Sequence, residues 1–247
     1  MKEFQDQVAI VTGAAQGLGA AVSGLLARQG ATVFLADLNA EGAQAQAEKL
    51  NREGCRAYGM GVDAADEGQL ASLREQLIAK TQGRLDILVN NAGGWRYGRV
   101  HEISASDWDW TFRTNVTSLF LTTRAFMTLM IKRNYGRIVN VASTDAYRAK
   151  PALPHYAAAK AAVVSLTRSL AEELAPHQIL VNGVSPGPIA TETAKQQSWL
   201  AERIKSIPIG RAAEPEDIAE VITFLASPRN RFVVGETVIA NGGILMA

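Results

Sequence analysis

A phenol and an ammonium stand four positions apart in the stretch HYAAAK, as Tyr156 and Lys160. The three alanines between them are the strongest helix formers, and residues four apart lie on one face of a helix. A free phenol has a pKa of about 10, and a nearby ammonium favours the charged phenolate. The pair therefore predicts a general acid/base that exchanges a proton with an alcohol or a carbonyl oxygen near neutral pH.

Ser143 fits the same chemistry, because it ends a predicted strand shortly before that helix. Its hydroxyl could hold the oxygen with which Tyr156 exchanges the proton. In isolation, the Tyr156–Lys160 spacing is more typical of an amphipathic tyrosine at a helix start and a solvated lysine. The acid/base interpretation gains its weight from the motifs that precede it.

A glycine-rich stretch, TGAAQGLG (12–19), lies between a predicted strand and a predicted helix. Glycines let the chain turn sharply and let a pyrophosphate approach the helix N-terminus, where free N–H groups and the dipole favour an anion. A tight turn without a ligand is the simpler alternative, but the surrounding β–α–β pattern favours a dinucleotide. The residues expected to contact it are Gly13, Gln16, Gly17, Leu18 and Gly19.

Asp37 ends the second predicted strand and is followed by Leu38. A carboxylate there can accept hydrogen bonds from both hydroxyls of an adenosine ribose and would repel a 2′-phosphate. DLNAEG contains no Arg or Lys, and position 16 is Gln, so NAD is favoured over NADP. Asp37 could instead cap the next helix, although Asn39 is available for that role.

Two further strand ends suggest cofactor contacts. Asp63 ends the third strand and could bind the adenine edge, or it could be a turn residue beside Asp66, the better N-cap. The fourth strand ends in NNAG (90–93), whose amides could tie neighbouring loops together. We expect Asn91, Ala92 and Gly93 to lie along the cofactor.

Short apolar runs that alternate with amphipathic stretches must position these residues. Strands are predicted at 8–13, 31–37, 55–63, 85–93, 136–143, 179–187 and 236–243, and helices at 17–29, 40–53, 66–81, 106–134, 155–175 and 214–227. This alternation predicts an α/β fold, a Rossmann-like, doubly wound, parallel seven-stranded sheet with helices on both faces. We expect one domain (1–247), with a cofactor-binding half at 1–135, a catalytic half at 136–247 and a substrate lid at 188–213.

The bulk properties exclude several classes. The formal net charge of +1 gives no basic excess for nucleic acid, and no apolar run has the length of a membrane span. Cys55 is the single cysteine and cannot form an internal disulfide, and the N-terminus has no signal-peptide pattern. We expect a soluble cytoplasmic protein. Three scattered histidines and one cysteine predict no metal site.

Taken together, these motifs resemble the short-chain dehydrogenase/reductase family over nearly the whole chain. TGAAQGLG, NNAG, RTNV, Ser143, YAAAK, VNGVSPGPIAT and GETVIANGG follow in order and at the usual spacing. The resemblance implies hydride transfer between a nicotinamide and an alcohol or carbonyl. It implies Tyr156 as general acid/base, Lys160 on the nicotinamide ribose and lowering the tyrosine pKa, Ser143 orienting the substrate oxygen, Asn115 anchoring a relay water, and Pro186, Gly187, Ile189 and Thr191 beside the cofactor.

The substrate is less defined by the sequence. Trp95 and Tyr147 could form an aromatic wall, and Arg96 and Arg148 could clamp a carboxylate. Solvated arginines and aromatics packed under the lid are the simpler alternatives. Asp145 and His155 flank the expected cleft, and His155 could equally pack at the helix N-terminus.

Three functions compete. An NAD-dependent dehydrogenase of a secondary alcohol, polyol, cyclic alcohol or dihydrodiol fits Asp37. The presence of Arg96 is similar to the dihydrodiol dehydrogenase branch of the family, in which the substrate carries a carboxylate. A 3-oxoacyl-ACP reductase also fits the pattern, with Arg133 and Arg137 as candidates for carrier docking, but such enzymes usually use NADPH. A nucleotide-sensing regulator without activity is opposed by the intact Ser143, Tyr156, Lys160 and Asn115.

The helices at 106–134 and 155–175 and the C-terminal GGILMA carry more small and apolar residues than one sheet face needs. In the family that the chain resembles, the corresponding helices pair across a two-fold axis. We therefore expect a homotetramer of D2 symmetry.

Overall fold

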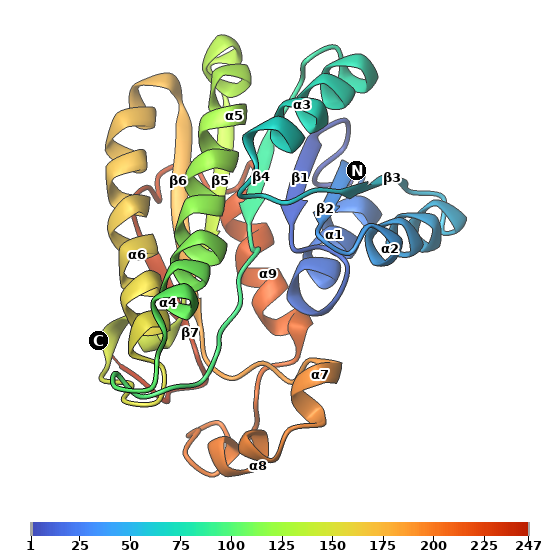
Figure 1. The fold of residues 1–247 in the computed structure, drawn as a ribbon. Coiled ribbons are helices and arrows are strands. Elements are labelled where there is room, and N and C mark those ends of the chain that lie inside the picture. Colours follow the sequence, from blue (N-terminus) through green and yellow to red (C-terminus); the bar gives the residue numbers. More distant parts are fainter. Residues whose placement is uncertain (1, 247) are drawn as a thin grey trace.

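The fold was analysed on a computed structural model, which describes residues 2–246. Its seven strands form one parallel sheet, as predicted, and their order is β3-β2-β1-β4-β5-β6-β7 (Figure 1). The strands are β1 (Val8–Thr12), β2 (Thr32–Asp37), β3 (Arg56–Gly61), β4 (Ile87–Asn90), β5 (Gly136–Val141), β6 (Ile179–Pro186) and β7 (Thr237–Ala240). The order reverses between β1 and β4, so the loops after these strands diverge and leave a crevice at their carboxyl ends.

Helices cover both faces of the sheet. The helices are α1 (Gly17–Arg28), α2 (Ala40–Arg52), α3 (Glu67–Thr81), α4 (Ala105–Phe112), α5 (Ser118–Arg133), α6 (Pro154–Leu174), α7 (Glu192–Lys195), α8 (Ser198–Ile204) and α9 (Pro215–Ala226), with short turns η1 (Arg113–Thr117), η2 (Thr144–Tyr147) and η3 (Ala175–His177). Figure 1 shows α4, α5 and α6 in front of the sheet and α9 behind it. No helix within residues 2–246 is long and apolar enough to cross a bilayer.

Alternate residues of each strand enter two separate cores. Ala9 and Val11 of β1 pack with α1, α2 and α9, while Val8 and Ile10 pack with α3, α5 and α6. Both sets are buried, which is why the strands read as continuous apolar runs rather than as an alternating pattern.

Polar side chains start several helices as expected. Asn39 Oδ1 accepts a hydrogen bond from Gly42 N (2.9 Å) at α2, and Asp66 Oδ1 accepts one from Gln69 N (2.9 Å) at α3. Both residues therefore cap, and Asp37 and Asp63 are released from that role.

A ladder of buried polar side chains links β4, β5 and α6. Asn90 Nδ2 of β4 donates to Asn140 Oδ1 of β5 (2.9 Å), and Asn140 Nδ2 donates to Thr167 Oγ1 of α6 (3.0 Å). All three side chains are buried. The ladder ties two central strands to the helix that carries Tyr156 and Lys160.

The single helix predicted at 106–134 is interrupted. Between α4 and α5 lies a π-helical turn, η1, which contains Asn115. The Asn115 amide donates to Thr111 O (2.9 Å), four residues earlier, and so occupies a carbonyl within the preceding helical turn. The strand ends were also predicted too long: 91–93, for example, form a loop rather than part of β4.

The segment 188–213 contains α7 and α8, which the sequence analysis did not predict. It projects from the carboxyl end of the sheet (Figure 1). A bridge between Ile189 and Ala213 closes its base. Ala190, Ala194, Leu200, Ile207 and Ala212 form a small core of its own.

Candidate active site

A cavity of about 970 Å³ opens at the carboxyl ends of the strands, bordered on one side by the segment 188–213. Most of the residues predicted to bind cofactor or substrate line it. They are Gly13, Gln16, Leu18, Gly19, Asp37, Leu38, Asp63, Asn91, Ala92, Gly93, Trp95, Asn115, Ser143, Asp145, Arg148, Tyr156, Lys160, Pro186, Gly187, Ile189 and Thr191. Gly17, Arg96, Tyr147 and His155 are not among the lining residues.

The loop between β1 and α1 can accept a pyrophosphate. Gly13 has φ +64°, and a Cβ on Gly19 would lie 2.0 Å from Gly13 O, so neither position tolerates a side chain. The first turn of α1 carries no acidic residue, and Gln16 makes no side-chain capping bond. The N–H groups at this helix start therefore remain available to an anion, which fits the dinucleotide predicted from sequence.

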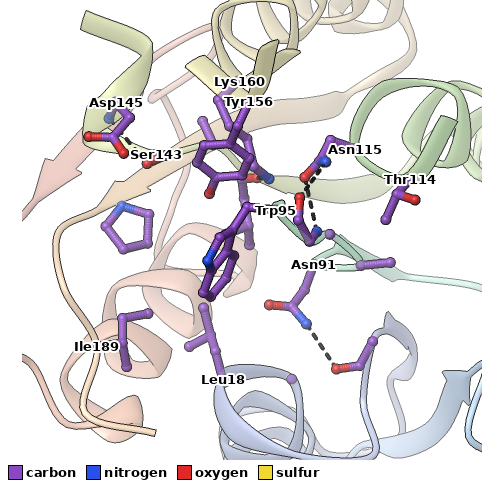
Figure 2. A pocket seen from close by; sticks show the side chains of 18 of the residues that line it. Leu18, Asn91, Trp95, Thr114, Asn115, Ser143, Asp145, Tyr156, Lys160 and Ile189 are labelled. Atoms are coloured by element: carbon purple, nitrogen blue, oxygen red, sulfur yellow. Dashed lines mark hydrogen bonds between the residues drawn. The ribbon is translucent and has the colours of Figure 1, made fainter. Parts of the chain in front are cut away.

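Asn91 ties the two central loops together. Its Nδ2 donates to Thr12 O (2.9 Å) and to Gly13 O (3.0 Å), as part of Figure 2 shows. The Thr12 hydroxyl in turn accepts hydrogen bonds from Asn91 N and Ala92 N (both 3.0 Å). The bridging role predicted for the asparagine pair thus holds for Asn91, whereas Asn90 belongs to the buried ladder.

Two carboxylates, those of Asp37 and Asp63, line the cavity at the carboxyl ends of β2 and β3. Asp37 accepts hydrogen bonds from Ala15 N and Asn39 N (both 2.9 Å). Within residues 2–246, no Lys, Arg or His forms an ion pair with its carboxylate. Asp63 accepts from Ala65 N (2.8 Å) and pairs with Arg113 (2.8 Å). The two acids therefore differ: the charge of Asp63 is matched by a cation and that of Asp37 is not.

Ser143, Tyr156 and Lys160 meet in the middle of the cavity (Figure 2). The Lys160 ammonium lies 5.7 Å from the centre of the Tyr156 ring and donates to Val141 O (2.8 Å). The Ser143 hydroxyl accepts from Asp145 N (3.1 Å). Trp95 meets the Tyr156 ring edge-on, with 6.2 Å between ring centres.

The chain's own groups do not lower the pKa of the phenol as the sequence analysis expected. Burial raises the pKa of Tyr156 to about 12, opposed by hydrogen bonding with Ser143 and assisted by the charge of Asp145. Burial also lowers the pKa of Lys160 to about 8. The expectation from spacing counted the attraction between the two charges and omitted the cost of burying either one.

Asn115 is fixed against the loop that follows β4. Its Nδ2 donates to Gly94 O (2.8 Å), and its Oδ1 accepts from Gly94 N (3.3 Å). A Cβ on Gly93 would lie 2.8 Å from Asn115 Oδ1 and 3.2 Å from Lys160 Nζ. Gly93 thus lets the asparagine and the ammonium approach the same point, which is compatible with the relay role that the family implies.

Several substrate residues are placed differently from the expectation. Arg96 pairs with Asp107 (2.5 Å) and stacks on Trp110 (4.2 Å), outside the cavity lining. Tyr147 packs against a sheet core, so the aromatic wall contains Trp95 without it. His155 is fully buried, in agreement with the packing alternative.

Other lining residues were missed by the sequence analysis. Lys150 and Arg203 stand beside Arg148 and Asp145, and Trp110 and Trp199 add aromatic surface. They come from separate segments, α4, the loop before α6, and α8, so no local spacing links them.

The two arginines proposed for carrier docking lie at the wrong end of the sheet. Arg137 is at the start of β5, is buried and donates to Asn230 O (3.1 Å). Arg133 ends α5 near Asp86, with 3.8 Å between charged atoms. Both arginines therefore lie at the amino end of the parallel strands, whereas the cavity lies at their carboxyl end. The expectation that Arg133 and Arg137 stand near the cleft was wrong.

A sequence model described as "Enoyl-(Acyl carrier protein) reductase" matches residues 13–245. The chain belongs to the short-chain dehydrogenase/reductase family. It is 36% identical to a 3-oxoacyl-[acyl-carrier-protein] reductase FabG of Aquifex aeolicus and 39% identical to a cyclopentanol dehydrogenase of Comamonas sp., each over 98% of both chains. The crystal structure of a 3-oxoacyl-[acyl-carrier protein] reductase with bound NAD from Brucella melitensis superposes with a TM-score of 0.92 and 34% identity, covering 100% of this chain and 94% of that one.

Family membership confirms the oxidoreductase class. This short-chain dehydrogenase/reductase acts on a CH–OH group with NAD or NADP, and the regulator without activity is excluded. The glycine loop, Asp37 and the other lining residues of the cavity could hold such a cofactor.

Proposed function

We propose that this enzyme uses NAD(H) to interconvert a secondary alcohol and a ketone, with a cyclic alcohol, polyol or dihydrodiol as the substrate type. The observation that carries the cofactor choice is the unpaired carboxylate of Asp37 in the cavity wall. A ribose 2′-hydroxyl can donate to it, whereas a 2′-phosphate would face a like charge. The neighbouring residue, Leu38, is 74% exposed and offers no positive charge.

A pair of binding titrations tests this choice. Two like charges about 5 Å apart near a protein surface repel by about 3 kcal/mol. Even with half of this repulsion screened by salt, NADH should bind at least about tenfold more tightly than NADPH. Asp37→Asn keeps the side-chain oxygen and removes the charge, and should reduce the ratio about tenfold. Glu41→Gln, in the first turn of α2, is the matched control. Equal affinities of the wild type for both cofactors would contradict the proposal.

The chain's own residues divide the proton chemistry. Ser143 holds the substrate oxygen, and Tyr156 takes its proton during alcohol oxidation or returns it during ketone reduction. Lys160 keeps a positive charge beside the phenol, and its bond to Val141 O fixes its position. The bound nicotinamide supplies the hydride acceptor or donor.

Replacing the phenol tests the assignment. With cyclopentanol as probe alcohol, Tyr156→Phe should lose about 10²- to 10⁴-fold in kcat while keeping its affinity for NADH. Tyr147→Phe, whose ring packs in a sheet core, controls for the loss of a tyrosine hydroxyl. Turnover retained in Tyr156→Phe would overturn the mechanism.

A 3-oxoacyl-ACP reductase is the second candidate, and the similarity to the Aquifex aeolicus reductase supports it. The unpaired Asp37 opposes it where NADPH is required. Reduction of an acetoacetyl thioester with NADH and NADPH side by side distinguishes the two. Fast turnover that prefers NADPH would favour fatty-acid synthesis and contradict the role given to Asp37.

The homotetramer and the cytoplasmic location remain predictions. Exposed aromatic residues on α5 and α9 and in the loop before β7 support subunit contacts: Phe120, Phe224 and Phe232 are 45%, 42% and 95% exposed in the single chain. Light scattering at micromolar concentration should give the mass of four chains, and a monomer would refute the assembly.

A further inference from the structure

Three cations surround one carboxylate on the substrate side of the cavity. Asp145 Oδ1 lies 2.8 Å from the Arg148 guanidinium and 3.9 Å from that of Arg203, and its Oδ2 lies 3.5 Å from Lys150 Nζ. All four residues line the cavity. Glu202 also borders it, but its carboxylate is bound by Lys205 (2.7 Å) and is largely exposed. The cluster therefore carries two unmatched positive charges.

The cations are not equally engaged. Arg148 holds Asp145 through Nε (2.9 Å) and Nη2 (2.8 Å), so these two residues form a closed pair. Lys150 and Arg203 reach the same carboxylate only at 3.5 Å and 3.9 Å, and within residues 2–246 neither side chain makes a shorter polar contact. Their N–H groups are free to bind another anion, with Arg148 and Asp145 as the support that positions them.

Partial burial strengthens the repulsion between these positive charges, because water screens them less than it would on an open surface. The side chains of Lys150 and Arg203 are 19% and 31% exposed. Burial lowers the pKa of Lys150, and the charges of Arg203 and Arg148 lower it further, against the attraction of Asp145. A second anion would offset this repulsion at a place where water screens charges only partly.

The cluster lies next to the residue that would hold the substrate oxygen. Asp145 N donates to Ser143 Oγ, the group that holds the substrate oxygen, and Figure 2 shows Asp145 beside Ser143. The cluster therefore borders the same part of the cavity as the hydroxyl that would hold the substrate oxygen. Trp95, Trp110 and Trp199 supply apolar walls in the same cavity.

We propose that Lys150 and Arg203 form an anion subsite that binds the carboxylate of a ring-bearing secondary alcohol or ketone. This assignment rests on the proposed alcohol/ketone chemistry and gives its substrate class. Arg203 comes from α8 and Lys150 from the loop before α6, so one bound carboxylate would also join the segment 188–213 to the body of the enzyme.

Binding of a matched pair of probes tests the subsite without requiring turnover. Cyclohexanecarboxylate and its neutral analogue cyclohexanecarboxamide would be titrated by calorimetry into the wild-type enzyme saturated with NADH. The carboxylate should bind at least tenfold more tightly. Lys150→Gln and Arg203→Gln should each weaken carboxylate binding about tenfold and leave carboxamide binding unchanged, while Lys49→Gln, which removes an exposed charge in the last turn of α2, should change neither.

The outcomes separate this inference from the proposed function. Equal binding of both probes, no binding of either, or unchanged carboxylate affinity in both variants would overturn the subsite. A parallel assay of cyclopentanone reduction by NADH reports on the alcohol/ketone chemistry alone. If Lys150→Gln and Arg203→Gln raise the KM of an acetoacetyl thioester of phosphopantetheine but spare cyclohexanecarboxylate binding, the cluster serves a carrier arm and the proposal is wrong.

Discussion

The Tyr156 phenol should remain protonated far above neutral pH when only the chain's own groups act on it. Burial raises its pKa to about 12. A rise of about two units corresponds to about 2.7 kcal/mol against ionisation, and at pH 9 only about one molecule in a thousand would carry the phenolate. The positive nicotinamide of NAD+ is the one further charge that alcohol oxidation brings to this place, so its binding should shift the ionisation to lower pH.

The assay is an absorbance titration of tyrosinate, recorded as the difference between the wild type and Tyr156→Phe. The difference removes the signals of Tyr58, Tyr97, Tyr135 and Tyr147. Without cofactor, the Tyr156 signal should be absent below about pH 11, and saturating NAD+ should move its midpoint downward. Asp145→Asn should also lower the midpoint, because the charge of Asp145 contributes to raising this pKa.

A midpoint at or below pH 10 in the protein without cofactor would refute the reasoning, since burial would then not dominate the ionisation of this phenol. The stability of the fold provides an independent check. Between about pH 10 and 12 the unfolded chain loses a proton that the folded chain keeps, so this tyrosine should make stability fall as pH rises through that window and contribute no slope below it.

Three further predictions concern residues around the cofactor. Gly19→Ala should cost more than 2 kcal/mol of stability and abolish NADH binding, because its Cβ would lie 2.0 Å from Gly13 O; urea unfolding and a binding titration measure both, and unchanged NADH affinity would contradict it. The pKa of Lys160 falls from 10.5 in the unfolded chain to about 8 in the folded chain. Between these pH values the unfolded chain holds a proton that the folded chain lacks, so the free energy of unfolding should rise by on the order of 3 kcal/mol from pH 8 to pH 10.5. Urea unfolding at pH 8 and pH 10 should show this rise in the wild type, and an equal rise in Lys160→Met would exclude Lys160 as its source. Asn115→Leu should cost about 2–4 kcal/mol, because the Gly94 N–H and C=O lose their partners. Urea unfolding measures this loss, and an Asn115→Leu protein as stable as the wild type would show that the amide is not needed to hold the loop after β4.

The sheet and the cofactor loop were predictable because their signals are local. Buried strands on a parallel sheet read as continuous apolar runs, and Asn39 and Asp66 are capping residues at the expected helix starts. The glycines of 12–19 are required by close backbone approaches, so the residue type itself carries the information. The sequence could therefore predict that the glycine loop, Asp37 and the Ser143–Tyr156–Lys160 group lie together, and all of the predicted contact residues among them except Gly17 line one cavity.

The substrate side could not be read in the same way, because its contacts join distant segments. Arg96 follows the expected strand end, yet Asp107 at the start of α4 takes its charge and Trp110 takes its planar face. Lys150, from the loop before α6, and Arg203, from α8, are more than 50 residues apart in the sequence, and only the folded chain brings both to Asp145. The interruption of the helix at Asn115 depends on a side chain competing for a carbonyl, which leaves no periodic trace in the sequence.

The buried ladder of Asn90, Asn140 and Thr167 sets the alignment of the central strands. Two neighbouring strands of continuously apolar residues could slip by two positions and still present apolar side chains to both faces. Such a slip would separate the Asn90 amide from the Asn140 oxygen and leave polar groups without partners in the interior, at about 1–3 kcal/mol for each group. It would also displace Ser143 by about 7 Å relative to Asn91. Amide groups with no chemical task thus exclude the misaligned sheets in which the residues at the strand ends could not act together.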